Sequence, residues 1–131
     1  MKEFNIRECQ IAEAAAVLAL WQAAGATVSL TDTLEDVQGA IASSAIHFLV
    51  AEQSVAEQSV AGKSVAENLN PENQVQMIGT LIAGFDGWRG NMYRLVVHPD
   101  YRRWGIATAL VTEAEARFRQ QGVKRITILV E

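Results

Sequence analysis

Apolar and polar positions follow two different periods along the first part of the chain. Residues 4–7 alternate with the period of two that is typical of a strand, and apolar residues over 11–21 recur at helical spacing. A second helix is indicated by the apolar residues spaced along 34–41. Asp32, followed three residues later by Glu35, resembles a capping box at the start of that helix. The pattern predicts a strand followed by two helices.

The second part of the chain is dominated by strand-like runs. Such runs cover 46–52, 76–85 and 91–97, and turn-rich residues separate the last two. A helix with one apolar face is predicted over 105–122, bounded by glycines, and 125–130 follows as a buried strand. The element order is βααβββαβ. The helical crossover before the last strand implies parallel pairing with its predecessor, so we predict an α/β domain with a mixed sheet.

One segment has a period that fits neither a helix nor a strand. Ala51-Glu-Gln-Ser-Val55 is repeated at 56–60 and, imperfectly, at 61–65. With a period of five, successive valines cannot stay on one face of either element. We therefore predict a single domain over 1–131 with a low-complexity loop insertion at about 51–74, because long surface insertions cost little stability.

Composition and charge narrow the class of protein. The chain has 131 residues, half of them apolar and 20% charged, which is ordinary for one soluble domain. Its 11 basic and 15 acidic residues give a net charge of -4, which argues against nucleic-acid and membrane partners. Cys9 is the only cysteine, and no Cys/His cluster has metal-ligand spacing. We expect a cytoplasmic protein without a metal, in which Cys9 is structural.

The junction between the strand over 91–97 and the following helix has the chemistry of an anion site. The first N–H groups of a helix lack intrahelical partners, and the helix dipole is positive there. Gly105 allows the backbone to approach a phosphate closely, Ala107 keeps the next turn small, and Thr108 adds a hydroxyl. Arg102 and Arg103 supply positive charge in an otherwise acidic protein. We predict that a phosphate group binds at this turn.

The same residues resemble a known family signature. Arg102-Arg103-Trp104-Gly105-Ile106-Ala107 fits the R/Q-x-x-G-x-G/A motif of the GNAT superfamily of N-acetyltransferases. The chain resembles small bacterial acetyltransferases, particularly those that are YpeA-like or similar to ribosomal-protein N-acetyltransferases. Outside the repeat, the resemblance covers nearly the whole chain. The further segments that carry it are 48–52, 78–82, Asp86-Gly87, 95–101 and Gly122 with 126–131.

The resemblance implies a fold, a cofactor and a reaction. It implies a mostly antiparallel mixed sheet flanked by helices, with acetyl-CoA as the cosubstrate and a primary amine of a small molecule or protein as the acceptor. The pantetheine arm would enter a splay between the strands that hold Val97 and Ile128, and a backbone N–H near Val97 would polarise the thioester carbonyl. The residues that it assigns to acetyl-CoA binding are Leu95, Val96, Val97, Arg102, Arg103, Trp104, Gly105, Ile106, Ala107 and Thr108.

The sequence departs from the family after Glu131, where the usual helix and C-terminal strands are missing. The tyrosine that serves as the acid on that helix has no counterpart here. As candidate bases or amine-orienting groups we select Glu52, at the end of a strand, and Asp86, in a turn. Trp88, in the same polar turn, is a candidate for substrate contact, and His98 is expected to cap a strand end.

Three alternatives follow from this departure: a partner supplies the missing layer, the chain binds CoA without efficient turnover, or it is a truncated form. A strand over 125–130 without an outer neighbour would be a hydrophobic edge, which favours a homodimer. The rival to an N-acetyltransferase is a catalytically impaired CoA-binding or interaction module. Release of CoA that depends on an added amine separates the two.

Overall fold

The computed structural model describes residues 3–54, 69–70 and 75–129 and contains a six-stranded sheet with the order β1-β2-β4-β5-β6, in which β3 pairs with β4. The strands are β1 (Asn5–Glu8), β2 (Ile46–Ser54), β3 (Leu69–Asn70), β4 (Val75–Phe85), β5 (Gly90–Val97) and β6 (Ile126–Ile128). The helices are α1 (Ala14–Ala23), α2 (Leu34–Ala42) and α4 (Ile106–Gln121), with short 3-10 helices at Ile11–Glu13 and Pro99–Tyr101. The predicted element order is confirmed, with β3 as an addition.

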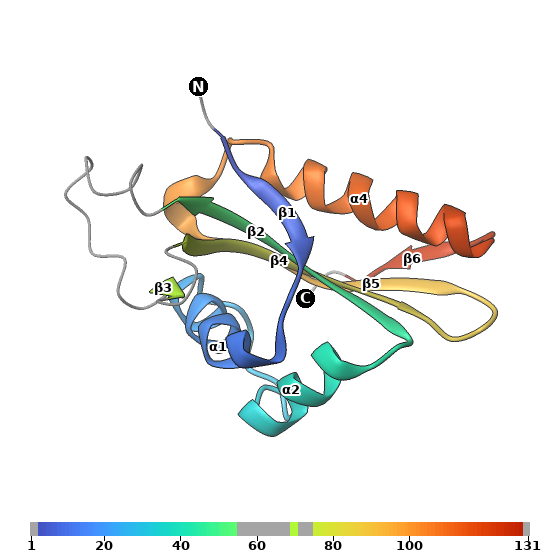
Figure 1. Cartoon of the computed structure of the whole chain (residues 1–131), viewed down its shortest axis with the longest axis horizontal. Helices are drawn as coiled ribbons and strands as arrows, with labels where there is room; N and C mark the ends of the chain where they lie inside the picture. Colours follow the sequence, from blue (N-terminus) through green and yellow to red (C-terminus); the bar gives the residue numbers. More distant parts are fainter. Residues whose placement is uncertain (1–2, 55–68, 71–74, 130–131) are drawn as a thin grey trace.

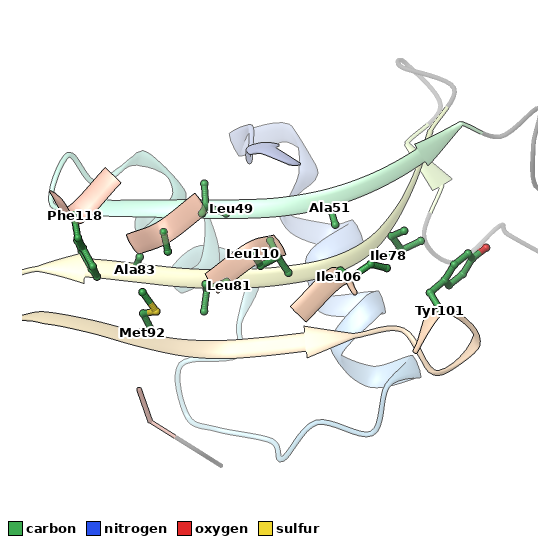
Figure 2. Close-up of a cluster of buried hydrophobic side chains, with 11 residues drawn as sticks. Leu49, Ala51, Ile78, Leu81, Ala83, Met92, Tyr101, Ile106, Leu110 and Phe118 are labelled. Carbon is green, nitrogen blue, oxygen red and sulfur yellow. The ribbon is translucent and has the colours of Figure 1, made fainter. Parts of the chain in front are cut away.

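The helices cover both faces of the sheet (Figure 1). Helix α4 lies on one face, and α1 and α2 lie on the other. Figure 2 shows Leu110 and Phe118 of α4 beside Leu49, Leu81 and Ala83 of β2 and β4. The opposite core contains Val17, Leu20, Trp21, Val37, Phe48 and Val50. Strands β2 and β4 thus alternate their apolar side chains between two cores, as the period of two requires.

All neighbouring strands are antiparallel except the last pair. Strands β5 and β6 run parallel, with Gly90 opposite Ile126 and Met92 opposite Ile128. Helix α4 makes the crossover between them, as predicted. It begins after Gly105 and ends at Gly122, and both glycines have a left-handed backbone with φ of 80°. The predicted limits of this helix are confirmed.

The start of α2 differs from the prediction. Its capping residue is Thr33, whose backbone is extended and whose Oγ1 accepts a hydrogen bond from the Asp36 N–H at 3.1 Å. Asp32 does not cap this helix. Its carboxylate instead forms an ion pair with Arg94 of β5. This tertiary contact decides which of the two neighbouring residues takes the capping position.

The predicted loop insertion begins too early. Strand β2 continues to Ser54 and pairs with β4 to its end, with a register shift between Ala51 and Glu52. The start of the first repeat copy is therefore strand, because β4 supplies a partner along its whole length. Residues 55–68 and 71–74 of the predicted insertion lie outside the described residues.

The prediction that the last strand is buried is wrong. Ile126 is 36% exposed and Ile128 is 48% exposed. Strand β6 pairs with β5 over three residues, and within the described ranges no strand lies on its other side. Its apolar side chains form an open edge.

In the described part of the chain, no helix combines the length and the apolar character that crossing a bilayer requires.

Candidate active site

The site is built around an irregularity in β5. One residue of β4, Leu81, lies opposite two residues of β5, Arg94 and Leu95. The flanking pairs are Thr80 with Val96 and Ile82 with Tyr93. Arg94 adopts a left-handed φ of 55°, a conformation that costs a residue with a side chain about 1–2 kcal/mol. This β-bulge bends β5 at the middle of the sheet.

The bulge keeps both cores filled. Met92 before it and Leu95 and Val97 after it pack on the α4 side. Tyr93 and Val96 pack on the side of α1 and α2. The extra residue is accommodated at Arg94 without moving its neighbours to the wrong face.

Arg94 is held by several contacts and is only 7% exposed. Its Nη2 donates to the Thr27 carbonyl oxygen at 2.9 Å and to Asp32 Oδ2 at 2.6 Å. The guanidinium lies 4.7 Å from the centre of the Trp21 ring. The Thr80 hydroxyl donates to the Arg94 carbonyl at 3.0 Å. These contacts offset the backbone strain and attach the loop between α1 and α2 to the bulge.

The pairing of β5 with β6 stops before the bulge, and a cavity lies between the following residues of β5 and the end of β6. Their pairing ends at Met92, whose carbonyl accepts from the Leu129 N–H at 2.8 Å. The cavity has a volume of about 460 Å³. Its lining includes Leu95, Val96 and Val97 of β5, Ile128 and Leu129 on the opposite side, Arg102 and Ala107 at one end, and Ala24, Ala26, Thr27 and Arg94. This cavity lies where the resemblance implies a splay between the strands that hold Val97 and Ile128.

The turn before α4 has the geometry of an anion site. Arg103 has a φ of 70° and Gly105 a φ of 80°, a local curvature that directs successive backbone N–H groups to one side. The first helical bond runs from the Ala109 N–H to the Gly105 carbonyl at 3.0 Å. The amides of 106–108 therefore precede the helical hydrogen-bond ladder. Arg102 and Ala107 connect this turn to the cavity.

Aromatic side chains hold the turn before α4 in place from its buried side. Tyr101 is buried, its hydroxyl donates to Gln76 Oε1 at 3.0 Å, and burial raises its pKa. The Tyr101 ring packs edge-on against Trp104, with 4.9 Å between ring centres. His98 Nδ1 accepts from the Asp100 N–H at 3.1 Å, so His98 caps the start of the short helix that follows β5, whereas the prediction was a cap of the strand end. Ile106 is buried in the core, which leaves only its backbone for ligand contact.

A second cavity, of about 550 Å³, lies on the α1 and α2 side of β5. Arg94 and Leu129 line both cavities. The second lining adds three aromatic side chains, two carboxylates and two hydroxyls, which are Trp21, Phe48, Tyr93, Asp32, Asp36, Ser29 and Thr31. Sequence reasoning missed this site. The available signal was the pair of carboxylates at Asp32 and Asp36, of which only Asp32 entered the prediction, together with Glu35 as a capping box.

The structure brings neither predicted base to these cavities. Glu52 Oε2 accepts from Arg7 Nε at 2.7 Å, and Arg7 also pairs with the buried Glu13 at 2.6 Å, so Glu52 belongs to an ion-pair cluster between β1 and β2. Asp86 Oδ1 accepts from the backbone N–H groups of Arg89 and Trp88, each at 2.8 Å, and these bonds lower its pKa. Asp86 therefore organises the β4–β5 turn.

Cys9 and Trp88 also lie in surroundings that argue against a role in the chemistry. Burial raises the pKa of the Cys9 thiol to about 12, so this thiol stays protonated. Trp88 is exposed and stacks with Arg89, with 4.1 Å from the guanidinium carbon to the ring centre, and it lines neither cavity. Within the described ranges, no group of three His, Cys, Asp or Glu side chains is placed to hold a metal ion.

Comparison with curated sequences gives several relatives that match in part. An acetyltransferase of Sodalis glossinidius is 42% identical over 55 residues, which span 42% of this chain and 39% of the relative. An acetyltransferase of Photorhabdus laumondii is 40% identical over 55 residues, which span 38% of its length. The matched region thus covers less than half of these relatives.

Solved structures match over nearly the whole chain. A PaiA N-acetyltransferase of Thermoplasma acidophilum, solved with coenzyme A, has a TM-score of 0.71 at 16% identity and aligns with 98% of this chain and 80% of its own. An aminoglycoside antibiotic 6'-N-acetyltransferase of Acinetobacter baumannii has a TM-score of 0.67 at 20% identity, with the same coverage. The sequence profile of the acetyltransferase (GNAT) family matches residues 21–131. The chain belongs to the acetyltransferase (GNAT) family.

Proposed function

We propose that the protein is an N-acetyltransferase, which transfers an acetyl group from acetyl-CoA to a primary amine. The observation that carries this proposal is the cavity between β5 and β6, which extends from the bulge at Arg94 to the turn at Arg102 and Ala107. An elongated cosubstrate with a phosphate group at one end and a reactive group at the other fits a cavity with these two ends. Family membership supports the same reaction.

The cosubstrate would be held mainly by backbone groups. Its pyrophosphate would accept hydrogen bonds from the amides of 103–108, with Arg102 and Arg103 adding positive charge. The pantetheine arm would run along the edge of 95–97, where β5 has separated from β6. The thioester would then lie near the bulge, beside the wall that both cavities share.

The reaction requires a neutral amine and a stabilised oxyanion. The amine nitrogen attacks the thioester carbonyl, a C–N bond forms, the C–S bond breaks, and CoA leaves as the thiol. Starting from the ammonium form, the nitrogen loses two protons. One of them goes to the departing thiolate, and one is released to solvent. A backbone N–H near Val97 would donate to the carbonyl oxygen as negative charge develops on it, which is stabilisation by a fixed dipole.

Two measurements test this proposal. Calorimetric titration of acetyl-CoA into the purified protein should show saturable binding. A thiol reagent should then detect CoA release that depends on an added primary amine. Binding without amine-dependent release would favour a CoA-binding module, and absence of binding at millimolar acetyl-CoA would contradict the proposal.

We also propose that the protein is cytoplasmic and forms a homodimer. The buried, unpaired thiol of Cys9 is compatible with a reducing compartment. The exposed apolar residues of β6, Ile126 and Ile128, offer an open strand edge to a second copy. A monomeric mass in size-exclusion chromatography with light scattering would count against the homodimer.

A further inference from the structure

The cavity on the α1 and α2 side has no role in holding the cosubstrate. It shares Arg94 and Leu129 with the first cavity, so a group bound in it lies next to the bulge. We propose that this second cavity binds the acceptor, and that the acceptor is a small primary amine with an apolar body and a single positive charge. This inference rests on the acetyl transfer proposed above.

The interior of the cavity suits an apolar body. Trp21 and Phe48 lie nearly parallel, at an interplanar angle of 17° and with 6.4 Å between ring centres, and both are buried. The Trp21 Nε1 donates to Thr80 Oγ1 at 2.9 Å, which fixes the indole in place. Tyr93 adds a third ring from β5. A preformed aromatic surface of this kind favours a ring or a branched alkyl group.

The charges that line the cavity leave an excess of one negative charge. The charged residues of its described lining are Asp32, Asp36 and Arg94. Arg94 and Asp32 pair at 2.6 Å and largely cancel each other. Asp36 remains, and its side chain is exposed and accepts a hydrogen bond from the Thr33 hydroxyl at 3.1 Å. A neutral hydroxyl does not compensate a carboxylate, so Asp36 favours a cation.

The net negative charge of the cavity lining favours a ligand with one ammonium group over an anion or a dication. An ammonium near Asp36 gains a charge-assisted hydrogen bond, whereas a carboxylate ligand would be repelled. The other carboxylate of the described lining, Asp32, is already paired with the Arg94 guanidinium, so it offers no free carboxylate to a second ammonium. A polyamine is therefore recognised less well than a monoamine.

The size of the cavity separates small molecules from proteins. A volume of about 550 Å³ is within the range of small-molecule pockets, which is about 300–1,000 Å³. We therefore assign the acceptor to the small molecules.

The test uses a matched series of ligands and two variants of the whole chain. Benzylamine is the monocation, benzyl alcohol its neutral analogue, para-xylylenediamine the dication, and a short peptide with a free N-terminus represents a protein acceptor. Asp36→Asn removes the charge in the cavity. Glu35→Gln is its control, because Glu35 is also exposed and lies in the same first turn of α2, but does not line the cavity.

We expect benzylamine to bind more tightly than benzyl alcohol. Asp36→Asn should raise the Kd and the KM for benzylamine about tenfold, the usual scale for one charge-assisted hydrogen bond, and leave kcat and acetyl-CoA affinity nearly unchanged. Glu35→Gln should change none of these. The diamine and the peptide should have a lower kcat/KM than benzylamine.

Several results would overturn this inference. They are equal binding of benzylamine and benzyl alcohol, equal effects of the two variants, or a higher kcat/KM for the diamine or the peptide. The outcomes also separate this inference from the proposed transfer. Asp36-dependent amine binding without CoA release would support amine binding in this cavity and reject acetyl transfer. CoA release that Asp36→Asn does not change would support acetyl transfer and reject the role of this cavity.

Discussion

The two glycines at the ends of α4 allow a controlled test of the phosphate turn. Gly105 and Gly122 have almost the same backbone, with φ of 80° and ψ of 15° and 20°. At each of them an added Cβ meets no other atom within 4 Å. Gly105→Ala and Gly122→Ala are therefore equivalent for the fold. They differ in position, because only Gly105 lies in the turn next to the cavity.

The cost in stability should be the same at both glycines. A left-handed conformation costs alanine about 1–2 kcal/mol. Alanine recovers about 0.4–1 kcal/mol because it also restricts the unfolded chain. The net loss is about 1 kcal/mol, which lowers the Tm of a domain of this size by about 3–5 °C. Both variants should remain folded at 25 °C.

The cost in cofactor binding should differ. A Cβ at Gly105 would occupy the open space in which a phosphate approaches the amides, and a hydrogen bond to a charged group contributes about 1.5–3 kcal/mol. Loss of one such bond weakens acetyl-CoA binding about tenfold or more. Gly122→Ala should bind acetyl-CoA like the wild type.

The assay is calorimetric titration of acetyl-CoA at 25 °C, together with thermal unfolding of each variant. Equal losses of Tm with unequal affinities would support the phosphate turn. If both variants bind acetyl-CoA as tightly as the wild type, the turn at Gly105 does not hold the phosphates. If Gly122→Ala weakens binding as much as Gly105→Ala, the effect comes from the helix as a whole.

Three further predictions concern the fold around the site. Arg94→Met removes the cationic partner of the largely buried Asp32 and should lower the free energy of unfolding in urea by about 3 kcal/mol; if adding Asp32→Asn restores none of this loss, the ion pair is not its cause. Cys9 should react slowly with iodoacetamide at pH 8 unless urea is added. Because its pKa rises from about 9 to about 12 on folding, the unfolded thiol loses its proton first and stability falls as pH rises through that interval; Cys9→Ala should reduce the slope, and an unchanged slope would contradict the shift. Glu52→Gln should weaken the pairing with Arg7 and leave amine-dependent CoA release unchanged, whereas a large loss of kcat would restore the catalytic role predicted from the sequence.

The sequence could predict the elements whose signals are local. The limits of α4 follow from Gly105 and Gly122, because both ends require a left-handed residue. The parallel pairing of β5 and β6 follows from the helix between them. The tight turn before α4 was predictable for the same reason, since the conformation of Gly105 depends on one short segment.

Features that depend on distant contacts could not be predicted. Asp32 with Glu35 satisfies the capping pattern as well as Thr33 does, and only the contact with Arg94, 62 residues away, distinguishes them. The apolar pattern of the sequence does not indicate the bulge, because both faces of β5 pack against a core. The exposure of β6 depends on what lies beside it, which the apolar residues of the strand do not specify.

The bulge at Arg94 shapes the site, but the packing of the two cores does not require it. If the chain were one residue shorter there, Leu95 would face Leu81 alone, and the side chains on either side would keep their present directions. Both cores would thus be satisfied by a regular strand. The extra residue and its strained backbone are unnecessary for packing. Among descendants of this gene that no longer need the activity, we therefore expect loss of this single codon to be tolerated together with a neutral residue at position 32, because the deletion also removes the cationic partner of Asp32.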